Sequence, residues 1–271
     1  MFAKLLKHEW RDSSRILTIF SLAALGAGAA AGFILRFLNE NASRLAQDPE
    51  SGWVSAVLVI VMVFVVFGLL AYALGSRILL LYRFYKSKFT DEGYLAFTLP
   101  VRSRQIFLAS LVNQLIWGLI SGLVLIFALG LMFLICAVGQ EIPLREMAQE
   151  IREGFSMSDF PKDYMTVTVL TGLVGGVAGY VTSLTCVVIG AVIAKRHKIL
   201  AAFGTYYVLS MVTGVLSSAA TSVLTRSVVS SALLEETMVT AQWINMGGQV
   251  ALALAGFFLS TYLMEKKLNL P

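Results

Sequence analysis

Acidic residues are missing from the six long apolar runs of this sequence, and charged residues are scarce throughout. Only 14% of the 271 residues are Asp, Glu, Lys or Arg, whereas 58% are hydrophobic, a balance far from that of soluble globular proteins. Each run is long enough to cross about 30 Å of hydrocarbon. The sequence therefore predicts an all-α integral membrane protein, a single transmembrane domain of residues 1–271. The expected spans are residues 16–37, 53–82, 106–138, 165–194, 199–224 and 241–264.

The same absence limits how such a protein can be energised. A carrier driven by protons or sodium usually needs an ionisable group near the middle of the membrane, so the lack of Asp and Glu argues against secondary transport. A phosphate-binding loop of the form GxxxxGK[ST] is missing too, and the chain therefore has no ATPase site of that type. Any energy from ATP must come from another subunit.

Cysteine, histidine and the common catalytic motifs give no sign of an active site. Cys136 and Cys186 lie inside apolar runs, which predicts neither a disulfide framework nor a thiolate metal site. His8 and His197 lie in separate segments without evident partner residues, and HExxH, GxSxG and CxxC are missing. We therefore expect no enzyme activity, no catalytic residue, no metal site and no cofactor in this chain.

The distribution of Lys and Arg predicts the topology. With the N-terminus inside the cell, the inner segments hold 15 of the 21 basic residues and the outer segments hold six. The positive-inside rule thus places both termini in the cytoplasm, and the net charge of +5 follows the membrane rather than a nucleic-acid partner. The inner residues are Lys4, Lys7, Arg11, Arg15, Arg77, Arg83, Lys86, Lys88, Arg102, Arg104, Lys195, Arg196, Lys198, Lys266 and Lys267; the outer ones are Arg36, Arg44, Arg145, Arg152, Lys162 and Arg226.

The first twelve residues have the pattern of an amphipathic helix that lies in the membrane surface. Apolar side chains fall on one helical face and basic ones on the other. Their charges also interrupt what would be the apolar core of a signal peptide, so we expect the first run to be retained. The apolar residues are Phe2, Leu5, Leu6 and Trp10, and the basic ones Lys4, Lys7, His8 and Arg11.

Residues 86–104 form a polar, basic elbow between the second and third spans, and the second span is expected to continue as helix toward Tyr85. Thr90 is a good N-cap, and negative charge at Asp91 and Glu92 favours the first turn of a helix. Pro100 ends that helix after about two turns, which is too short to be stable alone in water. We therefore expect it to dock on another surface, with a plain interfacial linker as the alternative. The helix includes Gly93, the apolar residues Tyr94, Leu95, Phe97 and Leu99 precede the proline, and Ser103 caps the next span between Arg102 and Arg104.

Two outer segments have patterns of their own. Residues 139–164 carry apolar side chains near helical spacing among Glu and Arg, with Pro143 suited to a first turn, which predicts a short amphipathic helix. Residues 225–240 contain Glu235 and Glu236, and a segment that dips back into the membrane is compatible with them. The sequence alone does not decide the second case.

Polar side chains within the spans are the candidates for a substrate path. In the fifth span they fall on one helical face, where they either bond to neighbouring helices or face a wet pathway. Amides in the third and sixth spans are more costly to bury, although an internal hydrogen bond would satisfy them equally well. The face holds Tyr206, Ser210, Thr213, Ser217 and Thr221, with Thr205 and Ser218 alongside, and the amides are Asn113, Gln114, Asn245 and Gln249.

Glycine pairs at i and i+4 allow close helix approach in lipid. Packing inside one protomer explains them at least as well as a dimer interface does. The pairs are Gly28 and Gly32, Gly118 and Gly122, Gly172 and Gly176, and Gly175 and Gly179.

The segment Asp91 to Gln105, DEGYLAFTLPVRSRQ, resembles the permease subunits of ABC-2-type transporters, which have the type V or ABCG-like architecture. Like that family's elbow, it has acidic residues, a glycine, an apolar stretch, Leu-Pro-Val and a Ser/Arg group. The resemblance implies a coupling helix seated on a separate ABC ATPase that holds ATP and Mg²⁺. It also implies a second permease copy, identical or different, and a central pathway lined by spans one, two and five. A bacterial plasma membrane is the expected location.

The resulting expectation is a permease subunit of an ATP-driven exporter for an amphipathic or hydrophobic cargo such as a peptide, lipid or drug. A non-transporting membrane anchor that passes ATPase motion to an outer partner is one alternative. A passive channel or secondary carrier is another. The residues expected to couple to the ATPase are Thr90, Asp91, Glu92, Gly93, Tyr94, Phe97, Leu99, Pro100 and Arg102.

Overall fold

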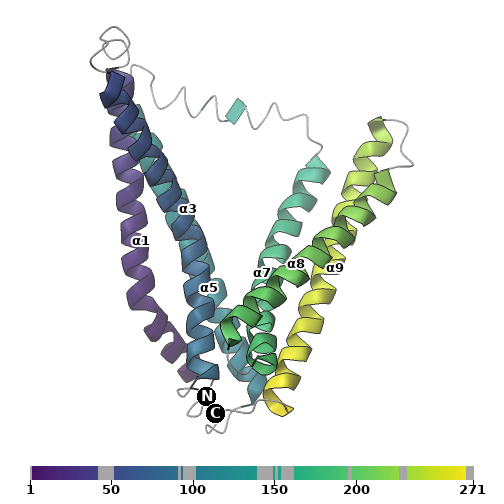
Figure 1. The fold of residues 1–271 in the computed structure, drawn as a ribbon. Helices are drawn as coiled ribbons and strands as arrows, with labels where there is room; N and C mark the ends of the chain where they lie inside the picture. The colour runs from purple at the N-terminus through teal and green to yellow at the C-terminus, as the bar shows by residue number, and fades with distance from the viewer. Residues whose placement is uncertain are drawn as a thin grey trace. The chain divides into compact units, whose positions relative to one another are not determined.

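Six long helices make up the computed structural model of this protein, which describes residues 2–41, 52–90, 93, 102–138, 149, 152–153, 162–194, 197–225 and 231–266 (Figure 1). All six are long and apolar enough to cross a membrane, so the prediction of an all-α, six-span protein is confirmed. The helices are α1 (Phe2–Glu40), α3 (Gly52–Phe89), α5 (Ser103–Ala137), α7 (Lys162–Ile193), α8 (Lys198–Thr225) and α9 (Ser231–Lys266).

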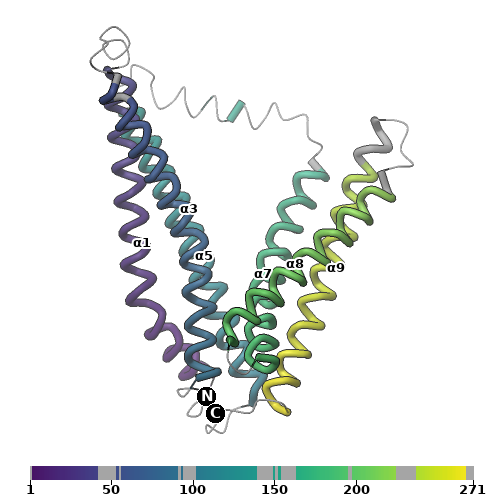
Figure 2. The backbone as a smooth tube through the Cα atoms, viewed as in Figure 1, coloured from purple at the N-terminus to yellow at the C-terminus, as the bar shows by residue number. Residues whose placement is uncertain are grey.

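The helices differ from the expected spans most clearly at the starts of α1 and α9. Residues 1–12 were expected to form a helix of their own in the membrane surface, but α1 begins at Phe2 and includes residues 2–12. Figure 2 traces α1 as one continuous tube. The second span continues as helix through Tyr85 to Phe89, as predicted. Helix α9 begins at Ser231 rather than near residue 241, so most of the segment 225–240 is helical. The helix expected in 139–164 falls mainly outside the described residues.

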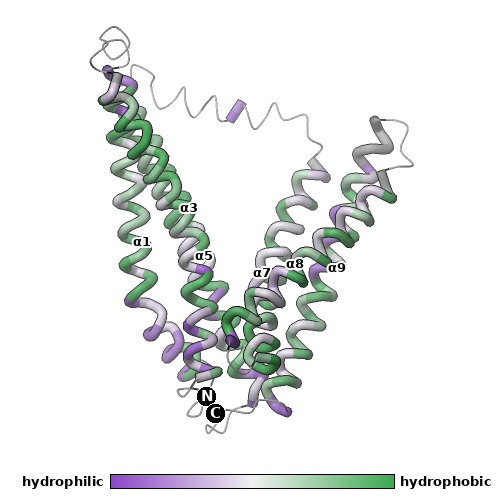
Figure 3. Tube along the Cα trace, in the orientation of Figure 1, coloured by the Kyte–Doolittle hydropathy of each residue, from purple (hydrophilic) through white to green (hydrophobic). Residues whose placement is uncertain are grey.

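Hydropathy follows the helices in the way a bilayer requires. Figure 3 shows a long hydrophobic stretch along α3 and hydrophilic residues at the start of α1. Large apolar side chains remain exposed, among them Phe64 at 72% and Leu200 at 73%. In a membrane such side chains contact lipid, and their exposure adds no hydrophobic cost.

The chain divides into two compact units. The first contains Met1–Glu9, Leu81–Leu115 and Asp159–Pro271, and the second contains Trp10–Leu80 and Ile116–Ser158. The boundary falls inside three helices, because α1, α3 and α5 each continue from one unit into the other. The first unit therefore holds all of α7, α8 and α9 together with one end each of α1, α3 and α5.

One hydrophobic core in the first unit joins all six helices. Phe84 and Phe89 of α3 pack with Phe107 of α5 and Val188 of α7, and Met264 closes the cluster from α9. Leu5 of α1 and Ala202 of α8 also contribute to this cluster. Phe107 is completely buried. The helix ends that flank the elbow are thus part of the core that all six helices share.

The second unit packs its three helices through small residues and a polar bridge. Gly28 faces the backbone of Ala128, where an added Cβ would lie 2.9 Å from the Ala128 Cα. An added Cβ at Gly32 would lie 2.8 Å from the carbonyl oxygen of Met132. The hydroxyls of Ser21 and Tyr72 lie 3.0 Å apart and link α1 to α3. Gly28 and Gly32 therefore serve packing within the chain, one of the two interpretations that the spacing allowed.

Candidate functional site

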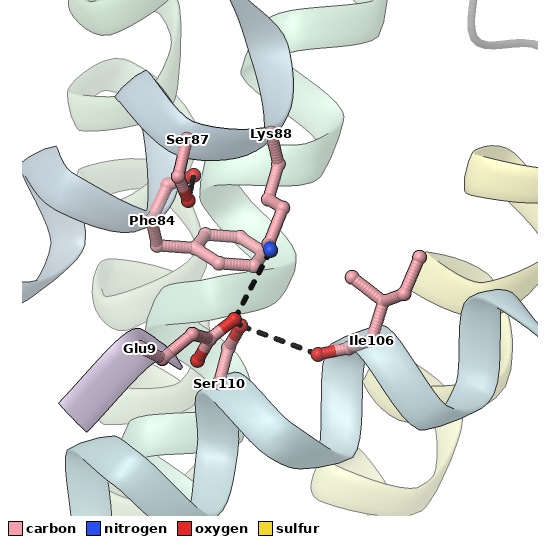
Figure 4. A network of polar contacts seen from close by, with 6 residues as sticks. All are labelled: Glu9, Phe84, Ser87, Lys88, Ile106 and Ser110. Carbon is pink, nitrogen blue, oxygen red and sulfur yellow. Dashed lines mark hydrogen bonds and ion pairs between the residues drawn. The ribbon is translucent and has the colours of Figure 1, made fainter. Parts of the chain in front are cut away.

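A buried ion pair fastens the start of α1 to the end of α3 beside the elbow. Figure 4 shows the Lys88 ammonium pointing at the Glu9 carboxylate, with Nζ and Oε1 3.1 Å apart. The same Oε1 accepts a hydrogen bond of 2.7 Å from the Ser110 hydroxyl on α5. The side chains of Lys88 and Glu9 are only 5% and 11% exposed. Charged groups that are this deeply buried need a partner of opposite charge. Lys88 and Glu9 provide that partner for each other.

Aromatic rings pack against one another along the end of α3 that carries Lys88. Phe84, one turn before Lys88 in Figure 4, meets the ring of Phe89 edge to face with centroids 5.6 Å apart. Tyr85 stacks on Phe89 at 6.3 Å. The Ser87 hydroxyl between them donates to the Phe84 carbonyl at 3.4 Å. The end of α3 therefore buries two aromatic rings, Phe84 and Phe89, beside the positive charge of Lys88.

The structure describes only part of the predicted coupling segment. Thr90, expected to cap a following helix, donates its hydroxyl to the Lys86 carbonyl at 2.5 Å, so this hydrogen bond closes α3. Gly93 is helical and buried, and its amide donates to the Thr90 carbonyl at 2.8 Å. An added Cβ there would lie 2.6 Å from the carbonyl carbon of Lys88, so only glycine fits. Asp91, Glu92, Tyr94, Phe97, Leu99 and Pro100 lie outside the described residues.

The start of α5 corrects the predicted cap. The Arg102 carbonyl accepts hydrogen bonds from the amides of Gln105 at 2.8 Å and Ile106 at 3.3 Å. Arg102 therefore occupies the position that precedes the helix, and Ser103 is its first residue. The Arg102 side chain is exposed. The prediction placed the cap one residue too late because Ser is the better capping type by propensity.

A cavity of about 400 Å³ lies between α7, α8 and α9, all within the first unit. It brings together the fifth-span stripe and the two amides of the sixth span. Helix α7 also lines the cavity, with small residues that were not among the predicted path residues. The i, i+4 spacing of Gly175 and Gly179 is visible in the sequence. The stripe residues are Tyr206, Ser210, Thr213, Ser217 and Thr221, the amides are Asn245 and Gln249, and the α7 residues are Gly175, Ala178, Gly179 and Thr182.

The hydroxyls along α8 already use their hydrogens. Ser210 donates to the Tyr207 carbonyl at 2.9 Å, Thr213 to the Leu209 carbonyl at 2.9 Å and Ser217 to the Gly214 carbonyl at 3.1 Å. These are bonds within the helix, of the kind that Ser and Thr make in membrane spans. Their oxygens keep lone pairs, so this wall of the cavity presents mainly acceptors.

Asn113 and Gln114, also expected on the path, do not line this cavity. Gln114 is 2% exposed, and neither of its amide atoms has a hydrogen-bond partner in the part of the chain that the structure describes. Burying an amide without a partner costs about 1–3 kcal/mol. The structure thus separates the predicted path residues into two groups.

Replacing Gln114 with leucine should stabilise the protein, because the substitution removes an unpaired buried amide and keeps the volume similar. We expect a gain of about 1–3 kcal/mol, measured by denaturant unfolding in detergent. Gln105→Leu on the exposed start of the same helix is the control and should change stability by less than about 0.5 kcal/mol. A loss of stability in Gln114→Leu would show that this amide has a partner.

Among the described residues, no group of three or more His, Cys, Asp or Glu side chains is placed to hold a metal ion. The two sites that the fold does build are the ion pair beside the elbow and the polar cavity. No protein-family model, curated protein or solved structure matches this chain. Function is therefore argued from these two sites and from the sequence.

Proposed function

We propose that this chain is the permease subunit of an ATP-driven exporter of the ABC-2 type, with the elbow between α3 and α5 as its coupling helix. A separate ABC ATPase would bind the elbow from the cytoplasm, and a second permease copy would complete the complex. The cargo would be amphipathic or hydrophobic. Residues 1–12, as the start of α1, would lie in the inner membrane surface.

The observation that carries the proposal is the position of the elbow. It joins two helix ends that belong to the core shared by all six helices, and a buried ion pair fixes one of those ends to α1. A displacement of the elbow would therefore act on every helix at once, since packed cores shift between discrete arrangements rather than deform smoothly. A plain linker between two spans needs no such anchorage.

The basic residues agree with an inner location for this end of the protein. Lys86, Arg102 and Arg104 are exposed at the two ends of the elbow, and the Lys and Arg count assigns the same segment to the cytoplasm. ATP binding would bring two ATPase subunits together. The coupling helices would move with them, and the bundle would switch between inward-open and outward-open states.

The cavity favours transport over a purely mechanical role. A protein that only transmits motion needs no space within its bundle, whereas this one has a cavity between α7, α8 and α9 of the size that small-molecule sites usually have. None of the described lining residues is Asp or Glu. A path of this kind suits a cargo without strong charge.

Charge reversal at the elbow tests the coupling role. The double variant Asp91→Lys, Glu92→Lys should insert normally but lose at least about tenfold of its transport-coupled ATPase activity, because like charges across a docking surface are strongly repulsive. Reversal of the adjacent acidic pair Glu235 and Glu236, in the predicted outer segment, is the matched control and should keep coupling. Assays use the reconstituted complex with its ATPase. Normal coupling in the elbow variant, or an elbow accessible only from outside, would refute the proposal.

A further inference from the structure

None of the described residues that line the cavity between α7, α8 and α9 carries a charged side chain. We propose that this cavity binds an amphiphile whose polar end is an uncharged group that both donates and accepts hydrogen bonds, such as a hydroxyl or a carboxamide, and that it discriminates against anions. The inference rests on the proposed function only in calling this ligand a substrate. Binding itself needs neither ATP nor a partner.

The hydroxyl groups of α8 favour a ligand that donates hydrogen bonds. Ser210, Thr213 and Ser217 direct their hydrogens to carbonyls of their own helix and offer oxygen lone pairs to the cavity. A ligand hydroxyl or amide N–H can use these acceptors, whereas a carboxylate or phosphate brings only further acceptors. An anion would thus lose its hydration, gain no donor from these three hydroxyls and meet no positive charge among the described lining residues.

The side-chain amide of Gln249 on α9 also favours a ligand that donates a hydrogen bond. The Gln249 Oε1 is buried and has no hydrogen-bond partner among the described residues. It lies against α7 at Gly175, where an added Cβ would be only 2.8 Å from it. A rotation of the Gln249 side chain away from Gly175 would let a ligand donor satisfy this oxygen, whose burial is otherwise unfavourable. The amides of Gln249 and Asn245 and the phenol of Tyr206 also bring donors to the lining, which a hydroxyl can use as an acceptor.

A cation is disfavoured for a different reason. An ammonium group would find acceptors here, but no carboxylate among the lining residues would neutralise it, and a buried charge without a counter-charge is costly. Leu209 and Leu216 of α8 and Leu252 of α9 also line the cavity, and their side chains suit an alkyl tail. The expected order of affinity is therefore an uncharged donor first, then a cation, then an anion.

Photolabelling of the full chain in phosphatidylcholine nanodiscs tests this order. The probes share one diazirine-bearing alkyl tail and carry a glucoside, a permethylated glucoside, an ammonium or a phosphate head, with each concentration corrected for partition into lipid. The glucoside probe should label α7, α8 and α9 lining residues saturably. The permethylated and phosphate probes should bind at least about tenfold more weakly, because two or more hydrogen bonds are lost.

Two double variants separate the cavity from the helix that forms it. Thr213→Val with Ser217→Ala removes two cavity acceptors and should weaken glucoside binding about tenfold. Thr205→Val with Ser218→Ala removes the same two residue types, which make equivalent hydrogen bonds within α8 but do not line the cavity, and should leave binding unchanged. Equal binding of the permethylated or phosphate probe, equal loss in both variants, or labelling outside α7 to α9 would overturn the inference.

The outcomes also separate this inference from the proposed function. Saturable glucoside binding together with normal coupling in the elbow variant would leave the binding site standing and remove the exporter. Lost coupling in the elbow variant together with no glucoside preference would do the reverse.

Discussion

Replacing Lys88 with methionine should destabilise the protein by about 3–5 kcal/mol, because it removes the positive charge that faces the buried Glu9 carboxylate. Glu9 is only 11% exposed at its side chain, and Lys88 supplies the positive charge 3.1 Å away. The Ser110 hydroxyl does not replace that charge. Thermal and denaturant unfolding in detergent would measure the loss of stability. The weakened contacts are those that Glu9, Lys88 and Ser110 make between α1, α3 and α5.

A double variant shows whether the pair or the lysine alone is responsible. Lys88→Met combined with Glu9→Gln removes both charges and should recover most of the lost stability, since a buried ion pair adds little over a neutral replacement. Lys86→Met, at an exposed position in the same turn, should shift stability by less than about 0.5 kcal/mol. Equal losses in Lys88→Met and Lys86→Met would contradict the burial of this charge, and no recovery in the double variant would contradict the pairing.

Adding a single methyl group at Gly28 should have the second largest effect on stability. The Cβ of Gly28→Ala would lie 2.9 Å from the Ala128 Cα, so the backbones of α1 and α5 must separate. Overpacking of this kind costs about 1–3 kcal/mol, and here the obstacle is main chain rather than a side chain that can rotate. Unfolding in detergent is again the measurement.

The neighbouring Gly26 gives the matched control. It lies on the same helix, and an added Cβ there meets nothing within 4 Å. Gly26→Ala should be neutral or stabilising by up to about 1 kcal/mol, because alanine is the better helix former. The two substitutions should therefore differ in sign. If Gly28→Ala also stabilises, α1 and α5 do not approach each other as closely as this structure shows.

Hydropathy was enough to predict the six helices and most of their lengths, because the cost of exposing backbone to lipid leaves helix as the default for each span. The face formed by Ser210, Thr213 and Ser217 was also visible, since it follows from helical spacing alone. The start of α9 was missed because Glu235 and Glu236 suggested a loop. Helices in a membrane protein often continue into water, where hydropathy no longer identifies them.

The pairing of Glu9 with Lys88 had no signal in the sequence. The two residues are separated by two spans, and each reads as an ordinary charge at the membrane surface. Tertiary packing decides which of many surface charges becomes buried. The hydroxyl of Thr90 donates to the helix before it, and because a hydroxyl can serve the helix before it as well as one after it, its role as a cap for a following helix stays a prediction.

Lys88 is held in place by contacts at both its main chain and its side chain. Its main-chain carbonyl group is covered by Gly93, and its ammonium group reaches Glu9 of α1. One residue thus spans the distance from the turn of the elbow to the first helix of the chain. A shift of the peptide at Gly93 must either be followed by α1 or strip the carboxylate of its counter-ion, so the two segments have few ways to move independently.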